Sequence, residues 1–129
     1  MMVMAKKFGP VELTFETRDD YLYARAKGET TALEIEQQCH NELAGKCHEV
    51  KAGRLMLVRD IPVALQSFDI FEMAKSIVDD LSGIRFACVN PYPANADPLH
   101  FGTIVALNRG VVYKVFDNEA DAEEWLLSN

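Results

Sequence analysis

Long apolar runs are absent from the sequence. No window of its 129 residues holds the roughly eighteen consecutive apolar residues that a membrane-spanning helix requires. Residues 1–8 are too short, and too soon interrupted by Lys6 and Lys7, to be the apolar core of a secretory signal. We therefore expect a cytoplasmic protein that does not insert into a membrane.

Cysteine and positive charge are both scarce. The three cysteines are an odd number without a secretion signal, so we expect reduced thiols rather than a disulfide framework. The 13 Lys and Arg residues against 20 Asp and Glu residues give a net charge of −7. This charge argues against a nucleic-acid partner, because binding to phosphates requires cationic side chains.

Glycine and proline are also few, at seven and five residues, which excludes collagen-like and disordered chains. Apolar residues make up 49% of the chain, enough to fill a hydrophobic core. We therefore expect a single globular domain that spans residues 1–129.

Apolar patterning predicts five strands. Residues 11–16 and 21–27 alternate between apolar and polar side chains around a short polar turn, as the strands of an antiparallel hairpin do. Continuous apolar runs, in contrast, are typical of strands buried on both faces of a parallel sheet. The remaining three strands are predicted at 55–58, 84–89 and 111–116.

Four helices are predicted between and after these strands. Thr31 and Glu34 have the spacing of a capping box, in which each side chain satisfies a free backbone N–H at a helix start. Ser67 can cap the second helix, and Asp97-Pro98 is a typical start for the third. The predicted helices cover 32–53, 67–83, 98–109 and a C-terminal segment capped by Asp117 or Asn118.

The resulting order, ββαβαβαβα, predicts an α/β domain with a mixed five-stranded sheet covered by four helices. A doubly wound nucleotide-binding fold would need a glycine-rich turn directly after a strand. The glycines here are scattered singly, which disfavours that fold and its cofactors.

The C-terminal third carries a more specific pattern. Residues 100–111 read HFGTIVALNRGV, and the chain continues through Val115, Phe116 and Asp117. This stretch resembles the helix end F-x-x-x-x-A-x-N-R-G and the following strand of small, uncharacterised bacterial STAS-like proteins. Their fold is that of the anti-sigma-factor antagonists, which is shared with lipid-binding CRAL-TRIO domains.

The resemblance implies candidate residues at the start of the second helix. Well-understood members carry a serine there, within Asp-Ser-x-Gly, that a partner kinase phosphorylates. Ser67 occupies a similar place, with Asp60 and Asp69 on either side, but no Asp directly precedes it and no Gly follows it. A phosphate would be stabilised at a helix N-terminus, although Asp69 would oppose it. The simpler interpretation is that Ser67 is an N-cap residue.

Two pairs, Cys39-His40 and Cys47-His48, carry side chains that bind zinc. Residues eight apart on one helix lie about 12 Å apart along its axis, too far for one ion to bridge. We therefore expect no metal, and interpret the cysteines as lying on the helix face toward the core with solvated histidines.

A nucleophilic Cys88 would need His100 as a nearby base. Cys88 lies within an apolar strand, so we expect a buried packing residue, and His100 to be at or near the surface. Asn108 and Arg109 could contact an anion, but Arg109 also complements a helix dipole, with Gly110 in the position that follows a helix end.

Two functions follow as hypotheses. The first is a non-enzymatic regulatory module that binds a protein partner through residues 61–67, with a homodimer as another possibility. The second is a carrier or sensor of a lipid or other small apolar ligand, held in a cavity between helices and sheet. Phe68, Phe71, Met73 and Phe101 could line such a cavity, although such side chains at helical spacing more often belong to a core.

Overall fold

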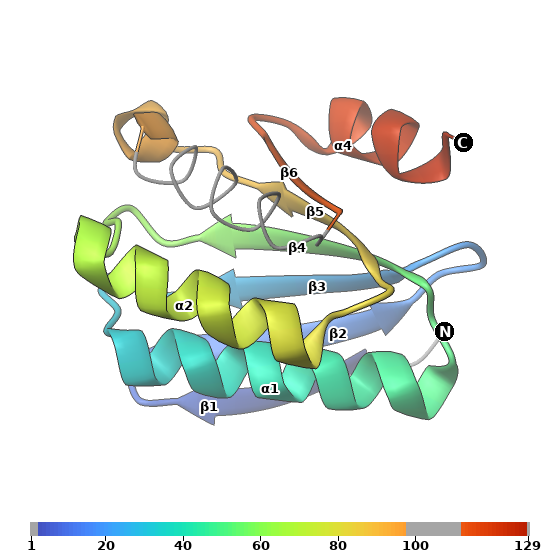
Figure 1. Ribbon diagram of the computed structural model, residues 1–129, viewed down its shortest axis with the longest axis horizontal. Helices are drawn as coiled ribbons and strands as arrows, with labels where there is room; N and C mark the ends of the chain where they lie inside the picture. The colour runs from blue at the N-terminus through green and yellow to red at the C-terminus, as the bar shows by residue number, and fades with distance from the viewer. Residues whose placement is uncertain (1–2, 98–111, 129) are drawn as a thin grey trace.

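The computed structural model describes residues 3–97 and 112–128, which form one six-stranded sheet with helices on both faces (Figure 1). The strands are β1 (Val3–Phe8), β2 (Val11–Thr17), β3 (Leu22–Lys27), β4 (Arg54–Asp60), β5 (Arg85–Val89) and β6 (Tyr113–Phe116). The helices are α1 (Leu33–Val50), α2 (Ser67–Asp80) and α4 (Glu119–Leu127), with a short 3-10 helix η1 (Pro93–Asn95).

The sheet is mixed, as predicted. Its strands lie in sequence order, with β1, β2 and β3 antiparallel and β3 to β6 parallel. Helices α1 and α2 cover one face of the sheet, and α4 covers the other face over β4 to β6 (Figure 1). Because β3 to β6 are parallel, their carboxyl ends and the loops that follow them lie at one edge of the sheet. We call this edge the carboxyl edge.

The prediction of five strands and four helices is wrong for the strands, because β1 precedes the predicted hairpin. Lys6 and Lys7 break the apolar alternation, but an edge strand tolerates lysines. Lys6 pairs with Leu13 in the register, and its Nζ lies 2.8 Å from Glu42 Oε1 of α1. Gly9, at φ 59°, begins the two-residue turn into β2, which requires a positive φ at that position.

The described residues contain three α-helices, and the third of the four predicted helices, 98–109, lies outside them. The predicted apolar face of α1 is confirmed, with Cys39, Leu43 and Cys47 all buried. The predicted helix ends are wrong. Ala32 is at the N-cap, and its methyl group cannot accept a hydrogen bond. Thr31, the predicted cap, donates to Glu36 at 3.3 Å instead of forming a capping box with Glu34.

At the other end of α1, the helix stops before Gly53. Lys51 adopts the left-handed conformation at φ 57°, and the N–H of Ala52 bonds to the carbonyl of Cys47 at 2.9 Å. The N–H of Lys51 also bonds to the carbonyl of His48, at 3.3 Å. Together the two bonds satisfy carbonyls of the last helical turn.

The core is divided between the two faces of the sheet. Strands β4 and β5 are buried along both faces, as their apolar runs predicted. On the second face, Ala122 and Leu126 of α4 pack against Met56, Val58 and Ala87. Asn118 caps α4 by accepting a 2.8 Å hydrogen bond from the N–H of Asp121, so Asn118 rather than Asp117 is the cap.

Candidate functional site

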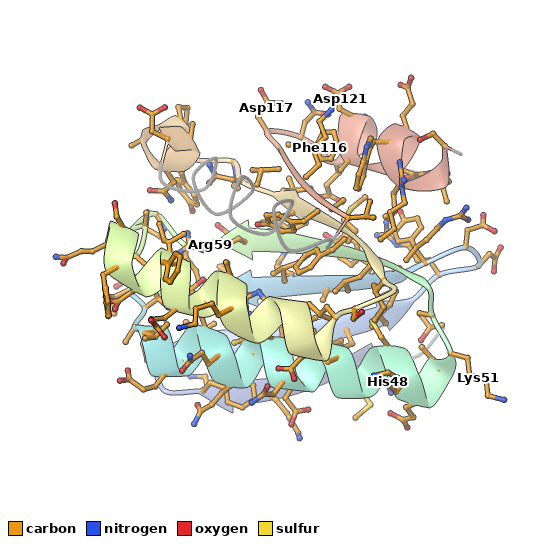
Figure 2. The ribbon with its side chains drawn as sticks, in the orientation of Figure 1. His48, Lys51, Arg59, Phe116, Asp117 and Asp121 are labelled. Carbon is orange, nitrogen blue, oxygen red and sulfur yellow. The ribbon has the colours of Figure 1, made fainter. Side chains whose placement is uncertain are left out.

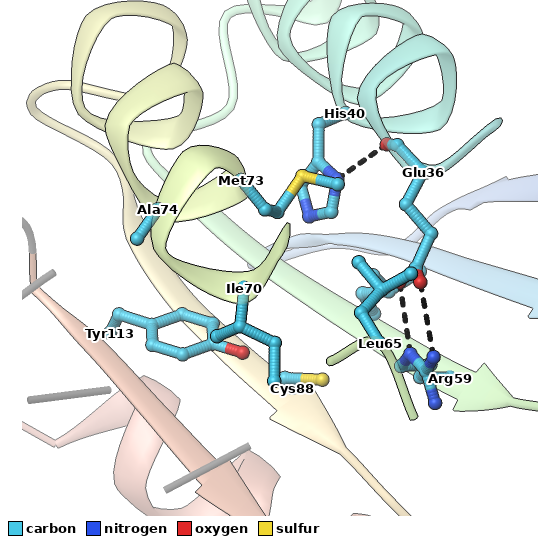
Figure 3. Close-up of a pocket in the computed structure, with 10 residues that line it drawn as sticks. Glu36, His40, Arg59, Leu65, Ile70, Met73, Ala74, Cys88 and Tyr113 are labelled. Carbon is cyan, nitrogen blue, oxygen red and sulfur yellow. Dashed lines mark hydrogen bonds and ion pairs between the residues drawn. The ribbon is translucent and has the colours of Figure 1, made fainter. Parts of the chain in front are cut away.

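A buried arginine, Arg59, holds the loop that precedes α2. Arg59 lies near the end of β4 (Figure 2), and its side chain is only 4% exposed. Its Nε and Nη2 donate to the two carboxylate oxygens of Glu36 on α1, at 3.0 and 3.1 Å (Figure 3). The pair is bidentate, the geometry that gives an ion pair its greatest strength.

Arg59 also binds the loop that follows its own strand. Nη1 donates to the carbonyl of Ile61 at 3.2 Å, and Nη2 donates to the carbonyl of Val63 at 2.8 Å. The buried amide of Asn95 donates to the carbonyl of Ile61 as well, at 3.0 Å. The loop of residues 61–66 therefore leaves the sheet with its first carbonyls fixed from two directions.

Burial opposes the charge on Arg59. The hydrogen bonds and the charge of Glu36 outweigh that effect, and the pKa of Arg59 is raised. The guanidinium therefore stays charged inside the protein. Such a pair is costly to break because either group alone would be a buried, uncompensated charge.

Asp60, a predicted site residue, is engaged across the carboxyl edge. It accepts a 2.6 Å hydrogen bond from the hydroxyl of Tyr92 and a 3.1 Å bond from Nη1 of Arg25. Arg25 also lies 3.6 Å from Glu119 at the start of α4. Asp60 thus connects β3, β4 and the segment after β5, and its hydrogen bonds hold these three segments together.

Ser67 and Asp69 share the first turn of α2. The carbonyl that accepts the first helical bond, from the N–H of Ile70 at 2.9 Å, belongs to Gln66. Gln66 is therefore at the N-cap position, and the prediction that Ser67 caps the helix is wrong by one residue. Ser67 is exposed, and Asp69 is partly exposed without an ion pair to any described residue.

Two apolar side chains project from the same short segment. Phe68 is 72% exposed and Val63 is 42% exposed, whereas Ile61, the first residue of the loop, is buried. An exposed phenylalanine at a helix start is costly to leave in water. The carrier hypothesis placed Phe68 in a cavity, and this placement is wrong.

A cavity of about 50 Å³ lies between α1, α2 and the sheet (Figure 3). Its polar lining is Glu36, His40, Arg59, Cys88 and Tyr113, and its apolar lining is Leu57, Leu65, Ile70, Met73 and Ala74. Met73 is the one predicted cavity residue in this lining, and Phe101 lies outside the described residues. The volume suits a few water molecules, and is smaller than the roughly 150 Å³ at which cavities take up benzene.

His40 is buried, so the prediction that it is solvated is wrong, whereas His48 is exposed as predicted. The Nδ1 of His40 lies 2.7 Å from the carbonyl oxygen of Glu36. Because a carbonyl only accepts, Nδ1 is the protonated nitrogen of the neutral ring. Burial lowers the pKa of His40, against weaker opposing effects of the Glu36 carbonyl and charge. The ring is therefore neutral at physiological pH.

All three cysteines are free and buried. Burial raises the pKa of Cys39 to about 12, with help from the nearby charges of Glu36 and Glu42, and raises the pKa values of Cys47 and Cys88 to about 11. Cys88 is a buried packing residue, as predicted. Thiols with such pKa values are poor nucleophiles.

The other predicted candidates give no constellation within residues 3–97 and 112–128. No three His, Cys, Asp or Glu side chains there could hold a metal ion. His100, Asn108, Arg109 and Gly110 lie outside these residues. No helix in the described part of the chain is both long and apolar enough to cross a membrane.

The described strands combine an antiparallel unit, β1 to β3, with the parallel strands β3 to β6, and helices lie on both faces of this sheet. No known family profile and no curated protein sequence matches the chain. A solved structure of an anti-sigma factor antagonist from Mycobacterium paratuberculosis matches with a TM-score of 0.61 at 14% identity, over 98% of this chain and 96% of that chain. The comparison confirms the predicted STAS-like fold.

Proposed function

We propose that this protein is a non-enzymatic regulatory module that acts in the cytoplasm as a single domain by binding another protein. The observation that carries the proposal is the shared fold over nearly the whole chain with a protein named as an anti-sigma factor antagonist. Buried thiols with raised pKa values are consistent with a packing role for the cysteines rather than a catalytic one.

The surface proposed to bind the partner is the loop of residues 61–66 together with the first turn of α2. We call it the loop–α2 surface. Arg59 and Asn95 hold the loop backbone, while Val63 and Phe68 remain exposed. A surface whose backbone is already ordered loses little conformational entropy on binding, which favours affinity.

Ser67 belongs to this surface, but we propose that it is not a phosphorylated switch. The flanking Asp and Gly of the family motif are absent, and Asp69 already places negative charge in the same helical turn. A phosphate on Ser67 would meet this charge at close range, which costs free energy.

The carrier function has weaker support. The cavity of about 50 Å³ would have to grow severalfold, by displacement of α2, before it could hold an apolar ligand. Native mass spectrometry of protein purified from its own cells tests this alternative. A bound lipid-sized ligand in equal ratio with the protein would favour the carrier over the regulatory module.

Affinity capture with two matched valine variants tests the proposed function. Val63 is 42% exposed on the loop–α2 surface, and Val112 is 47% exposed at the opposite edge of the sheet, before β6. We expect tagged wild type and Val112→Asp to enrich the same protein from cells, and Val63→Asp to lose it. Equal enrichment by all three, or no enriched protein with wild type, would contradict the proposal.

A further inference from the structure

The loops at the carboxyl edge carry charge of a single sign. The four segments that follow the parallel strands, 28–32, 61–66, 90–97 and 117–118, contain no Lys, Arg or His. They contain three acidic residues, Glu29, Asp97 and Asp117, all exposed. The helices that begin at this edge add Glu34, Asp69 and Glu119 in their first turns.

The cations closest to this edge along the chain do not neutralise it. Arg59 is paired with Glu36, and Arg25 is shared between Asp60 and Glu119. Lys27, the last residue of β3, and Lys114, two residues before the end of β6, are the remaining cations of the parallel strands there. Within the described residues, Asp69 and Asp97 make no ion pair.

The opposite edge of the sheet differs in charge. Lys51 follows α1, Arg54 begins β4 and Arg85 begins β5, and these cations lie at the same edge as Asp19 and Asp20 of the turn before β3 and Asp80 at the end of α2. Figure 2 shows His48 and Lys51 at the end of the molecule opposite Arg59. The opposite edge therefore carries charges of both signs, whereas the four loops of the carboxyl edge, which include Val63, carry acidic residues alone.

We propose that the partner at the loop–α2 surface is a protein with an apolar pocket rimmed by lysine and arginine side chains, and that Phe68 inserts into this pocket. This inference rests on the proposed function and specifies its partner. A phenylalanine that is 72% exposed supplies a central apolar anchor of the kind that dominates interfaces. The surrounding carboxylates steer a basic surface toward it and repel an acidic one.

The same charge disfavours a second copy of this chain as the occupant. Two carboxyl edges brought face to face would place Asp69 and Asp97 of one copy against the like charges of the other. No cation in the four loops of this edge is present to offset the repulsion. A basic partner meets no such penalty.

Site-specific photo-cross-linking identifies the occupant. Replacing Phe68 by p-benzoylphenylalanine, in the full chain expressed in its own cells, should yield one cross-linked protein. The same replacement of Val112, exposed at the opposite edge, is the control and should yield none. Mass spectrometry of the cross-linked peptide should place the contact beside lysines or arginines of the partner.

The purified partner then allows affinity to be measured. We expect Phe68→Ser to weaken binding by at least about 30-fold, and Val112→Ser to leave it unchanged. Raising the salt from about 50 mM to about 500 mM should weaken binding by about tenfold or more, because the rim charges are screened. Asp69→Asn should reduce this salt dependence, whereas Glu49→Gln, on the last turn of α1, should not.

The outcomes separate the inference from the proposed function. A partner that binds with no salt dependence, or through an acidic surface, overturns the inference and leaves a protein-binding module. Cross-links from position 68 to a second copy of this chain, or to lipid, overturn it as well. The absence of any cross-linked protein from either position, together with no captured partner, overturns the proposed function itself.

Discussion

Arg59→Met is expected to be the most destabilising single change at the candidate site. It removes four hydrogen bonds, two to Glu36 and one each to the carbonyls of Ile61 and Val63. Breaking a buried ion pair by removing one partner costs about 3–5 kcal/mol, because the other charge is left uncompensated. We therefore expect the free energy of unfolding to fall by about 4 kcal/mol, a large part of the roughly 5–15 kcal/mol of a typical domain.

Urea denaturation followed by far-UV circular dichroism measures this change. The double variant Glu36→Leu with Arg59→Met leaves no buried charge, so it should be more stable than Arg59→Met alone by about 2 kcal/mol. Lys6→Met is the control, because the Lys6–Glu42 pair is 53% and 35% exposed, and it should change stability by less than about 0.5 kcal/mol. A loss below about 1 kcal/mol for Arg59→Met would refute the assigned role of the pair.

Four further predictions concern buried and exposed side chains. Because burial lowers the pKa of His40, the unfolded chain takes up a proton before the folded protein does as the pH falls. Stability should therefore be constant above about pH 7 and fall below about pH 6.5, by up to about 1.4 kcal/mol per pH unit, and His40→Gln should weaken this dependence in urea titrations. Cys39, Cys47 and Cys88 should react with iodoacetamide only after unfolding in urea, and rapid labelling of any one in the native protein would contradict its burial. Ser67→Ala should change stability by less than about 0.5 kcal/mol, because Gln66 holds the N-cap position, and a loss above about 1 kcal/mol would restore Ser67 as the cap. Ser67→Asp should bind the partner as wild type does, and a stoichiometric phosphoserine at this position in protein from its own cells would show that the switch exists.

Much of the fold was predictable because each element carries a local signal. The apolar runs of β4 and β5 reflect burial on both faces, and the four-residue spacing of Cys39, Leu43 and Cys47 reflects the face of α1 that meets the sheet. The edge strand β1 was not predictable in this way. As an edge strand, β1 pairs with β2 alone. An edge strand tolerates lysines, so Lys6 and Lys7 interrupt the apolar alternation that would have indicated a strand.

The candidate site was only partly predictable, because its organising contact joins residues far apart in the chain. Glu36 and Arg59 look like solvated charges when each is read within its own segment. A charged residue directly after an apolar run, as in Arg59, is the signal that could have indicated a buried pair. The position of α2 was predicted, whereas the cap residue was not, since a helix start is uncertain by a residue or two.

Hydrogen–deuterium exchange of the protein, alone and in complex with its captured partner, tests the central claim most directly. We expect the partner to slow exchange in residues 61–70, which include the loop and the first turn of α2, and to leave the amides of β1 unchanged. Phe68→Ser should abolish this protection at the same partner concentration. Protection confined to β1–β3, or absent from residues 61–70 in a saturated complex, would contradict the loop–α2 surface as the site of function.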